Sequence, residues 1–484
     1  MRVHFVAVAG TGMGALAGLL RAAGHDVSGS DTSFYPPIGP ALERWGIRLM
    51  EGFSAEHVAD RPDLVVIGNV CRPTNVEARA AIDGGLRHAS MAHALAELVL
   101  EGRSPLVVGG THGKTTTSAM CAHVLASVGM DPGYLIGGIP MGQSESFRLP
   151  GPRRLPLDGG HRSSSRKAPF VVEGDEYDTA FFEKTPKFWH YRPEVGIVTS
   201  IEHDHIDIYP TEESYLAAFR GFAERIPEGG LLVASAHDPL VVRTLSGTKA
   251  ELAYYALDSD ESSAPPHWMG AIASRGPDDT TFDVYAGGVY AGRAALRVPG
   301  DHNVRNALAA LAACCQGFGA DVKQAMAALE TFEGVKRRQE LRYEVGGVRV
   351  YDDFAHHPTA VRETLAALRA KHPEGKLWAV FEPRSATACR KLHQEAYASS
   401  FASASRVLFP PLGRPEIPEA ERLDLDALAQ ALRERGILAS HVTSVDAIVE
   451  LIAQDAAPGD TVALLSNGAF GGIYEKLELA LQKR

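Results

Sequence analysis

Short apolar runs alternate with helical patterns of apolar and polar residues over the first hundred positions. Residues 3–9 and 63–67 are mainly apolar runs of strand length, residues 26–30 are predicted to form a short strand between them, and residues 13–23 carry an amphipathic helical pattern that ends before Gly24. Strands that alternate with helices are typical of parallel βαβ units. The N-terminal segment is therefore predicted to form a parallel α/β domain.

Two more blocks of the same kind follow along the chain. The second opens with the apolar run 106–108, after a charged, glycine-containing break at residues 101–105. The third opens after the basic run at residues 333–338. Its predicted strands are residues 348–351, 377–381, 406–409 and 461–465.

The chain length agrees with this division. At roughly 150 residues a domain, 484 residues leave room for about three domains. We expect them at residues 1–100, 101–335 and 336–484. Residues 146–167 are rich in Pro, Gly, Ser and Arg and are predicted to form a surface loop, with an arginine-bearing lid as the alternative. Residues 258–266 form a smaller break of similar character.

Composition excludes several classes of protein. The chain has 48 lysines and arginines against 59 aspartates and glutamates, a net charge of −11 that argues against a dedicated nucleic-acid binder. It lacks the run of about 18 apolar residues that a transmembrane helix needs, and its start does not resemble a signal peptide. The five cysteines fit neither a disulfide framework nor a zinc site. We therefore expect a cytoplasmic protein with no membrane or nucleic-acid partner; its oligomeric state is left open.

A glycine-rich turn connects the first predicted strand to the first predicted helix. The turn is Gly10-Thr11-Gly12-Met13-Gly14, and Asp31 follows at the end of the next strand. This is the dinucleotide-binding pattern, in which glycines let the backbone approach a diphosphate and the acidic residue accepts bonds from a ribose. The turn does not distinguish a nicotinamide dinucleotide from another nucleotide diphosphate, and a tight turn without a nucleotide is the alternative.

The second turn carries a sharper signal. After the strand at residues 106–108 the chain reads Gly109-Gly110-Thr111-His112-Gly113-Lys114-Thr115-Thr116 and enters a predicted helix. In such a loop, amides at the helix start hold phosphate oxygens, the lysine neutralises the β and γ phosphates, and a hydroxyl can bind Mg²⁺. Val108 departs from the strict pattern because it stands at the outer glycine position. The combination of strand, loop and helix still predicts a phosphate site.

Carboxylates and imidazoles follow two further predicted strands. Four carboxylates follow the strand near residue 172, and Glu173 is the best metal-ligand candidate because it is nearest the strand end. Residues 202–207 read Glu-His-Asp-His-Ile-Asp after the next strand. Solvated acidic turns are the alternative for any single carboxylate. A zinc site of two histidines and a carboxylate is conceivable, but Mg²⁺ beside the phosphate loop explains more of the chain.

Two clusters remain. Asn303 and Asn306 lie one helical turn apart and could face a base edge together. The alternative is that Asp301 or Asn303 caps a helix over residues 307–315. Residues 351–359, which contain Asp353 and His357, again stand at a strand end, where ligands bind in open α/β sheets.

These blocks, in this order, resemble the Mur ligase family, the ATP-dependent enzymes that form amide bonds in bacterial cell-wall peptide assembly. The resemblance runs through most of the chain and rests on several motifs together. They are residues 110–116 (GTHGKTT), 173–176 (EGDE), 202–207 (EHDHID), 300–306 (GDHNVRN) and 352–358 (DDFAHHP). The resemblance implies a Rossmann-like N-terminal domain for a UDP-sugar, a central P-loop ATPase domain and a Rossmann-like C-terminal ligase domain.

The resemblance also implies roles for individual residues. Catalysis would fall to Lys114, Glu173 and His205, and Mg²⁺ would be held by Thr115, Glu173 and His205. ATP would contact the phosphate loop from Gly110 to Thr116 together with Asn303, Asn306 and Asp353. The UDP group would lie on the turn from Gly10 to Gly14 and on Asp31. The incoming peptide would bind Arg384 and His357; for Arg384 a structural role is the alternative.

The His-His-Pro block at residues 356–358 and residues 27–31 resemble the branch that uses UDP-N-acetylmuramate, and finer motifs stand at residues 34–37, 67–69, 176–182, 351–357, 382–385 and 466–472. Within it they favour ligation of L-alanyl-γ-D-glutamyl-meso-diaminopimelate through an acyl phosphate, as in peptidoglycan recycling. Ligation of L-alanine alone, as in de novo synthesis, is the alternative. Two hypotheses from other functional classes each explain only one glycine-rich turn. An NAD-dependent oxidoreductase would explain the turn at residues 10–14, and a P-loop switch would explain the turn at residues 109–116.

Overall fold

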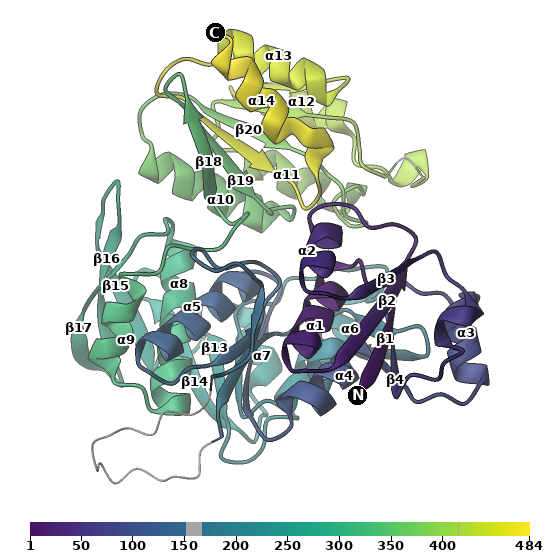
Figure 1. Ribbon diagram of the computed structural model, residues 1–484. Helices are drawn as coiled ribbons and strands as arrows, with labels where there is room; N and C mark the ends of the chain where they lie inside the picture. The colour runs from purple at the N-terminus through teal and green to yellow at the C-terminus, as the bar shows by residue number, and fades with distance from the viewer. Residues whose placement is uncertain (152–166, 415) are drawn as a thin grey trace.

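The computed structural model describes residues 1–151, 167–414 and 416–484, and these residues contain three large β-sheets that follow one another along the chain, with one two-stranded sheet besides (Figure 1). Each large sheet is flanked by helices, so the predicted arrangement of three α/β domains is confirmed. The three sheets occupy residues 2–90, 104–296 and 340–465, while the predicted domain boundaries themselves stay a prediction. In the described ranges, none of the helices has both the length and the apolar character needed to cross a bilayer.

The N-terminal sheet has five parallel strands in the order β3-β2-β1-β4-β5. Its strands are β1 (Arg2–Val6), β2 (Asp26–Asp31), β3 (Arg48–Glu51), β4 (Leu64–Ile67) and β5 (His88–Ser90). Its helices are α1 (Thr11–Ala22), α2 (Ile38–Arg44), η1 (Ala55–Val58), α3 (Val76–Asp83), α4 (Met91–Leu95) and η2 (Ala96–Leu100). The order reverses at β1, which is the point where open α/β sheets bind ligands.

The central sheet has ten strands in the order β17-β16-β15-β14-β13-β12-β6-β9-β7-β8. They are β6 (Ser104–Gly109), β7 (Gly133–Leu135), β8 (Phe147–Arg148), β9 (Pro169–Glu173), β12 (Val195–Val198), β13 (Leu231–Ser235), β14 (Glu251–Leu257), β15 (Trp268–Arg275), β16 (Thr280–Ala286) and β17 (Val289–Leu296). Seven neighbouring strands of this order, β15-β14-β13-β12-β6-β9-β7, run parallel to one another. Antiparallel strands lie at both edges of the sheet, β16 and β17 at one and β8 at the other.

Helices cover both faces of this sheet, and a small hairpin projects from it. The hairpin is β10 (Asp178–Ala180) and β11 (Glu183–Pro186). The helices are α5 (Lys114–Ser127), η3 (Lys187–His190), α6 (Glu212–Ala223), α7 (Pro239–Leu245), α8 (Asp301–Ala312), η4 (Ala313–Gly317) and α9 (Val322–Leu329). Because strand side chains alternate, Leu106 and Val108 pack with α5 and α8, whereas Val107 packs on the opposite face with α6. That second core continues without interruption into the N-terminal domain.

The C-terminal sheet has six strands in the order β18-β19-β23-β20-β21-β22, parallel except for β18. They are β18 (Glu340–Val345), β19 (Val348–Asp353), β20 (Leu377–Phe381), β21 (Arg406–Phe409), β22 (Leu438–His441) and β23 (Thr461–Leu465). The helices are α10 (Pro358–Lys371), η5 (Lys391–His393), α11 (Gln394–Ser400), η6 (Glu419–Glu421), α12 (Leu425–Glu434), α13 (Val445–Asp455), η7 (Phe470–Gly472) and α14 (Ile473–Gln482). Two apolar clusters of its own fill the two faces of this sheet.

The structure refines two expectations from the sequence and corrects a third. The predicted loop at residues 146–167 begins with β8, whose Phe147 is buried; its residues 152–166, and with them the lid alternative, lie outside the described part of the chain. The break at residues 258–266 holds an ordered ion pair, because Asp260 accepts a hydrogen bond of 2.9 Å from Arg305. The predicted helix over residues 307–315 begins six positions earlier, at Asp301.

Candidate nucleotide and metal site

The phosphate loop connects β6 to α5, as the sequence predicted, and two of its glycines have no room for a side chain. Gly110 has φ +130°, and a Cβ there would lie 2.1 Å from Thr199 Oγ1. Gly113 has φ +79°, and a Cβ there would lie 2.6 Å from Asn306 Oδ1. Both positions therefore require glycine for conformation and for space.

The segment after β12 anchors the loop. Thr111 N donates to Ser200 O at 2.9 Å, and Thr111 Oγ1 donates to Glu202 O at 3.1 Å. His112 Nε2 lies 2.7 Å from Glu202 Oε2. Burial alone would raise the pKa of Glu202, but His112 and the nearby His357 lower it to about 2. The predicted cluster at residues 202–207 thus holds the phosphate loop in place.

Lys114, the predicted phosphate lysine, is buried and fully engaged in this structure. Its ammonium donates to Gly110 O at 2.6 Å and to Glu176 Oε2 at 3.0 Å. Burial would lower the pKa of Lys114, but Glu176 and the neighbouring carboxylates raise it above its usual range. The lysine therefore remains charged, with a carboxylate and a carbonyl in the places that phosphate oxygens would take.

Glu176 is a site residue that sequence reasoning missed. It is completely buried, and its Oε1 atom lies 3.2 Å from His205 Nε2. Burial would raise its pKa, yet Lys114 and His205 lower it to about 2. The sequence singled out Glu173 among four adjacent carboxylates because it is nearest the strand end; only the burial of Glu176 distinguishes it, and no spacing rule encodes that burial.

Thr115 and Glu173 form an oxygen pair that suits a magnesium ion. Thr115 Oγ1 donates to Glu173 Oε1 at 2.9 Å. Neighbouring ligands of an octahedral Mg²⁺ with bonds of about 2.1 Å lie about 2.9 Å apart, so the two oxygens fit one ion. Burial and then Asp175 raise the pKa of Glu173, a penalty on its charge that a bound cation would relieve.

His205, the third predicted metal ligand, contacts Glu176 instead. In the described part of the chain no hydrogen bond or ion pair joins His205 to Thr115 or Glu173. Burial would lower the pKa of His205, but Glu176 and Asp204 raise it above its usual range. In this arrangement His205 neutralises Glu176, and its predicted role as a metal ligand stays a prediction.

Arg338 is a second site residue that the sequence did not single out. Its Nη2 donates to Thr115 Oγ1 at 2.9 Å, across the predicted boundary between the central and C-terminal domains. It lines the same cavity as the phosphate loop. The residue belongs to the basic run that was interpreted only as a domain break, and that run was the available signal.

A cavity of about 460 Å³ lies between the central and C-terminal domains. Many of its walls are residues predicted to bind ATP: His112, Gly113, Thr115, Thr116, Asn303, Asn306 and Asp353. Gly110, Thr111 and Lys114, the other predicted ATP-binding residues of the loop, are not among the residues that line the cavity. Asp353 Oδ2 accepts from Gln339 N at 2.8 Å and its Oδ1 accepts from Ala355 N at 2.7 Å, so it shapes the wall as well.

The two asparagines are buried beside the loop and bond to each other. Asn306 Nδ2 donates to Asn303 Oδ1 at 3.2 Å, and Asn303 Nδ2 donates to Pro299 O at 2.7 Å. The capping alternative is wrong, because α8 begins at Asp301 after Gly300 and has no side-chain cap. The pair therefore forms part of the cavity wall beside Gly113.

The N-terminal turn is exposed at the start of α1. Gly10, Thr11 and Gly12 are accessible, whereas Met13 is 6 % exposed and packs in the core, so only its backbone faces the turn. A Cβ at Gly14 would lie 2.7 Å from Ile38, so this glycine serves close packing. Asp31 Oδ2 accepts from Ala9 N at 2.8 Å, and the carboxylate thereby supports the turn itself.

The two predicted peptide-binding residues lie in different surroundings. Arg384 is half exposed and rests against Gly468, with Nη1 4.0 Å from Glu382 Oε1. His357 is buried at the start of α10, with Nδ1 3.2 Å from Glu202 Oε2 and its ring 4.7 Å from that of His112. His357 thus faces the phosphate loop, away from the surroundings of Arg384.

Comparison with protein families divides the chain into the same three parts. Residues 2–103 match the Mur ligase family catalytic domain, residues 108–314 the Mur ligase middle domain, and residues 337–468 the Mur ligase glutamate ligase domain. The matched segments contain the glycine turn, the phosphate loop and Asp353 respectively.

Individual proteins resemble the chain over most or all of its length. A UDP-N-acetylmuramate–L-alanyl-γ-D-glutamyl-meso-2,6-diaminoheptandioate ligase from Escherichia coli (strain K12) is 35 % identical, covering 100 % of this chain and 99 % of the relative. A UDP-N-acetylmuramate–L-alanine ligase from Kineococcus radiotolerans is 38 % identical over 83 % of this chain and 79 % of its own. The crystal structure of a murein peptide ligase from Psychrobacter arcticus 273-4 matches with a TM-score of 0.72 and 35 % identity, covering 100 % of this chain and 99 % of that one.

Proposed function

The chain belongs to the Mur ligase family, and we propose that it joins UDP-N-acetylmuramate to L-alanyl-γ-D-glutamyl-meso-diaminopimelate at the expense of ATP. The observation that carries the proposal is the shared cavity, in which the phosphate loop of the central domain and Asp353 of the C-terminal domain face one space. A nucleotide there would lie between the two domains, and the glycine turn of the N-terminal domain would be left for the UDP group. Membership of a ligase family favours this reading over an oxidoreductase or a P-loop switch.

The first step is phosphoryl transfer. Amide formation in water is uphill, so the muramoyl carboxylate attacks the γ-phosphorus of ATP, the bond to ADP breaks, and an acyl phosphate forms. Negative charge spreads over the transferred oxygens in this step, and fixed cations stabilise it. Lys114 supplies one such charge by exchanging Gly110 O and Glu176 for phosphate oxygens, and Arg338 supplies a second beside Thr115.

Thr115 and Glu173 would hold Mg²⁺ through their paired oxygens. The ion would supply further positive charge against the β and γ phosphates. His205 keeps Glu176 ionised, so that this buried carboxylate can position Lys114 until the nucleotide arrives.

The second step is aminolysis. The alanyl amine of the peptide attacks the acyl carbon, phosphate leaves, and the amine loses a proton. Arg384, half exposed in the C-terminal domain, presents a planar guanidinium that suits a peptide carboxylate. The turn from Gly10 to Gly14 presents the amides at the start of α1 to the diphosphate of the UDP group.

L-Alanine as acceptor is the second candidate, favoured by the relative from Kineococcus radiotolerans at 38 % identity. The tripeptide is preferred because the relative with that name and the crystal structure of a murein peptide ligase are both 35 % identical over the whole chain, whereas L-alanine ligases that cover 96–99 % of the chain are 32–34 % identical. A cytoplasmic location goes with these substrates and stays a prediction.

One assay tests the proposal. The purified protein is given ATP, Mg²⁺ and UDP-N-acetylmuramate with either the tripeptide or L-alanine, and the products are identified by mass spectrometry. We expect ADP and the UDP-muramoyl-tripeptide. Product from L-alanine alone would establish the second candidate, and nucleotide hydrolysis without any ligated product would refute both.

A further inference from the structure

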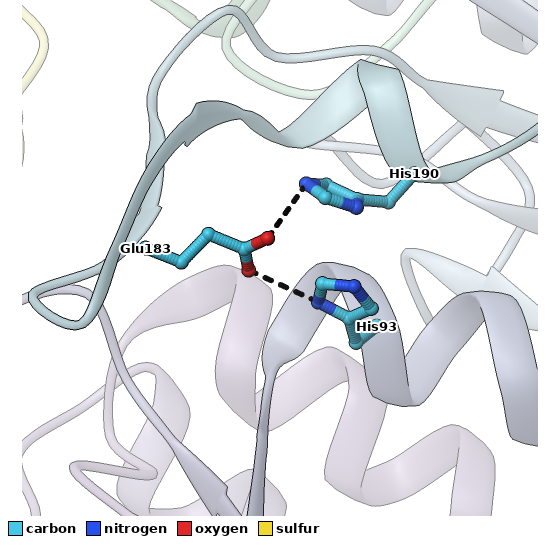
Figure 2. A group of neighbouring side chains, drawn as sticks. All are labelled: His93, Glu183 and His190. Carbon is cyan, nitrogen blue, oxygen red and sulfur yellow. Dashed lines mark ion pairs between the residues drawn. The ribbon is translucent and has the colours of Figure 1, made fainter.

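Two imidazoles and a carboxylate meet where the N-terminal domain lies against the central domain, outside the site described above. His93 projects from α4, Glu183 from the start of β11, and His190 from η3 (Figure 2). His93 Nδ1 lies 3.1 Å from Glu183 Oε2, and His190 Nε2 lies 3.8 Å from Glu183 Oε1. The three elements belong to two domains, since α4 packs against η3 and β10 across the junction.

The spacing of these atoms fits a single metal ion. One ligand atom from each residue lies within 4.8 Å of the other two. Ligands of a tetrahedral Zn²⁺ with bonds of about 2.0–2.2 Å lie roughly 3.3 Å apart, so side-chain adjustments of about an ångström or less bring the three atoms onto one ion. Ser90 Oγ lies 3.1 Å from His93 Nδ1 and Thr185 Oγ1 lies 2.9 Å from His190 Nε2, so an ion bound to these nitrogens would replace the two hydroxyl contacts.

Access also suits metal binding. The side chain of His93 is 46 % exposed and that of Glu183 is 27 % exposed, so solvent reaches the cluster and water can complete the coordination.

We propose that His93, Glu183 and His190 bind a divalent late first-row metal ion of the Zn²⁺ class, which ties α4 of the N-terminal domain to η3 of the central domain. Two imidazoles select such an ion over Mg²⁺, which prefers oxygen ligands. Among the described residues the other group of this kind is His112, Glu202 and His357, but it adjoins the nucleotide cavity and belongs to that site.

The test measures Zn²⁺ binding to the full-length protein after treatment with a chelator. Equilibrium dialysis against Zn²⁺ alone, followed by metal analysis, counts the ions bound by the wild type and by His93→Gln. His93 is the residue to change because it is half exposed, so its loss leaves the fold intact. The matched control is His88→Gln, an exposed histidine of β5 whose Nδ1 lies 3.0 Å from the Leu86 carbonyl oxygen.

We expect His93→Gln to lose one Zn²⁺ site, or to weaken that site by about a hundredfold or more, because even removal of a residue behind a ligand costs about 10–100-fold. Zn²⁺ should raise the melting temperature of the wild type and of His88→Gln more than that of His93→Gln, since binding to the folded state stabilises it. Zn²⁺ sites at the nucleotide cavity are common to all three proteins and cancel in the comparison. Equal stoichiometry and affinity in the wild type and His93→Gln would overturn the proposal, as would binding only at millimolar Zn²⁺.

Discussion

The central domain joins its two neighbours in different ways. Toward the N-terminal domain the junction is largely apolar, although it also holds the cluster of His93, Glu183 and His190 and an ion pair between Arg44 and Glu145. The ring of Phe147 in β8 packs edge-on against Trp45 with centroids 5.0 Å apart. A Cβ at Gly18 of α1 would lie 2.5 Å from the same ring, which shows how closely the helix approaches. One apolar cluster runs through both domains.

Toward the C-terminal domain the junction is polar. Arg338 donates to Thr115, Thr359 Oγ1 donates to Glu202 Oε1 at 2.9 Å, and His357 lies against the same carboxylate. In the described ranges, the apolar clusters of the C-terminal domain contain no residue of the central domain. The nucleotide cavity lies at this junction.

The two junctions therefore differ in how much free energy it costs to change them. Apolar area once buried is expensive to expose, about 25 cal/mol per Å², so the N-terminal junction holds one geometry. Hydrogen bonds between protein groups exchange for bonds to water or ligand at a net cost of about 1 kcal/mol each. The junction that must accept a nucleotide is therefore built from contacts that exchange cheaply.

The largest effect is expected from a substitution in the phosphate loop, which should impair catalysis and leave binding of the sugar nucleotide nearly unchanged. Lys114→Ala should lower kcat by about a thousandfold or more, because it removes a fixed charge from phosphoryl transfer. Binding of UDP-N-acetylmuramate, measured by calorimetry, should stay within about twofold of the wild type since the turn at Gly10 is untouched. Lys187→Ala is the control, because it removes another buried, ion-paired lysine outside the loop. Ligation by Lys114→Ala at a near wild-type rate would refute the central assignment.

The apolar junction can be broken directly. Phe147→Ala should destabilise the protein by about 3–5 kcal/mol, the usual cost of deleting a buried aromatic ring. Chemical denaturation followed by tryptophan fluorescence measures this, and Trp45 reports on the junction itself. Phe147→Leu, which keeps most of the volume, should cost clearly less. A loss below about 1 kcal/mol in Phe147→Ala would show that β8 does not fasten the N-terminal domain.

The polar junction should respond to pH. Burial and then His112 lower the pKa of His357 to about 3. Between about pH 6.5 and pH 3 the unfolded state binds a proton that the folded state does not, so stability falls as the pH is lowered through this window. At pH 5 the proton bound by the unfolded state lowers the free energy of unfolding by about 2 kcal/mol.

Urea midpoints at pH 7 and pH 5 measure this contribution. The wild type should lose about 2 kcal/mol more than His357→Gln over this interval, because the variant has no imidazole to protonate. Equal losses in the two proteins would mean that His357 is not held neutral at the junction.

The smallest effect on stability is expected from a single polar contact. Thr359→Val removes the hydrogen bond to Glu202 and should cost about 1 kcal/mol. The KM for ATP should rise several-fold, since Thr359 also lines the cavity. Thr359→Ser keeps the hydroxyl and should restore both values. A stability loss as large as that of Phe147→Ala would erase the distinction between the junctions.

Much of the fold could be predicted from the sequence because parallel strands buried on both faces read as unbroken apolar runs, as at residues 64–67 and 377–381. Strands β15 to β18, each of which has an antiparallel neighbour, were missed because one face of each is exposed and the alternation is irregular. The start of α8 was placed late because its first turn, Asp-His-Asn, is polar.

For the site, motifs predicted which strand ends carry chemistry but not which side chain meets which. Asn303, Asn306 and Asp353 line the same cavity as the loop, as the family resemblance implied, although their ligands stay a prediction. The pairing of Lys114 with Glu176 depends on burial in three dimensions, and the contact of Arg338 with Thr115 depends on how two domains meet. Neither is encoded in local spacing.

The nucleotide cavity has walls from two domains, and this makes ATP affinity a measure of domain geometry. If only a fraction of molecules holds the C-terminal domain in the binding arrangement, the observed Kd equals the intrinsic value divided by that fraction. A substrate or substitution that shifts this population changes ATP binding without touching the nucleotide, and ATP shifts the domain equilibrium by the same free energy in return. Nucleotide titration therefore reports how the C-terminal domain stands relative to the central one.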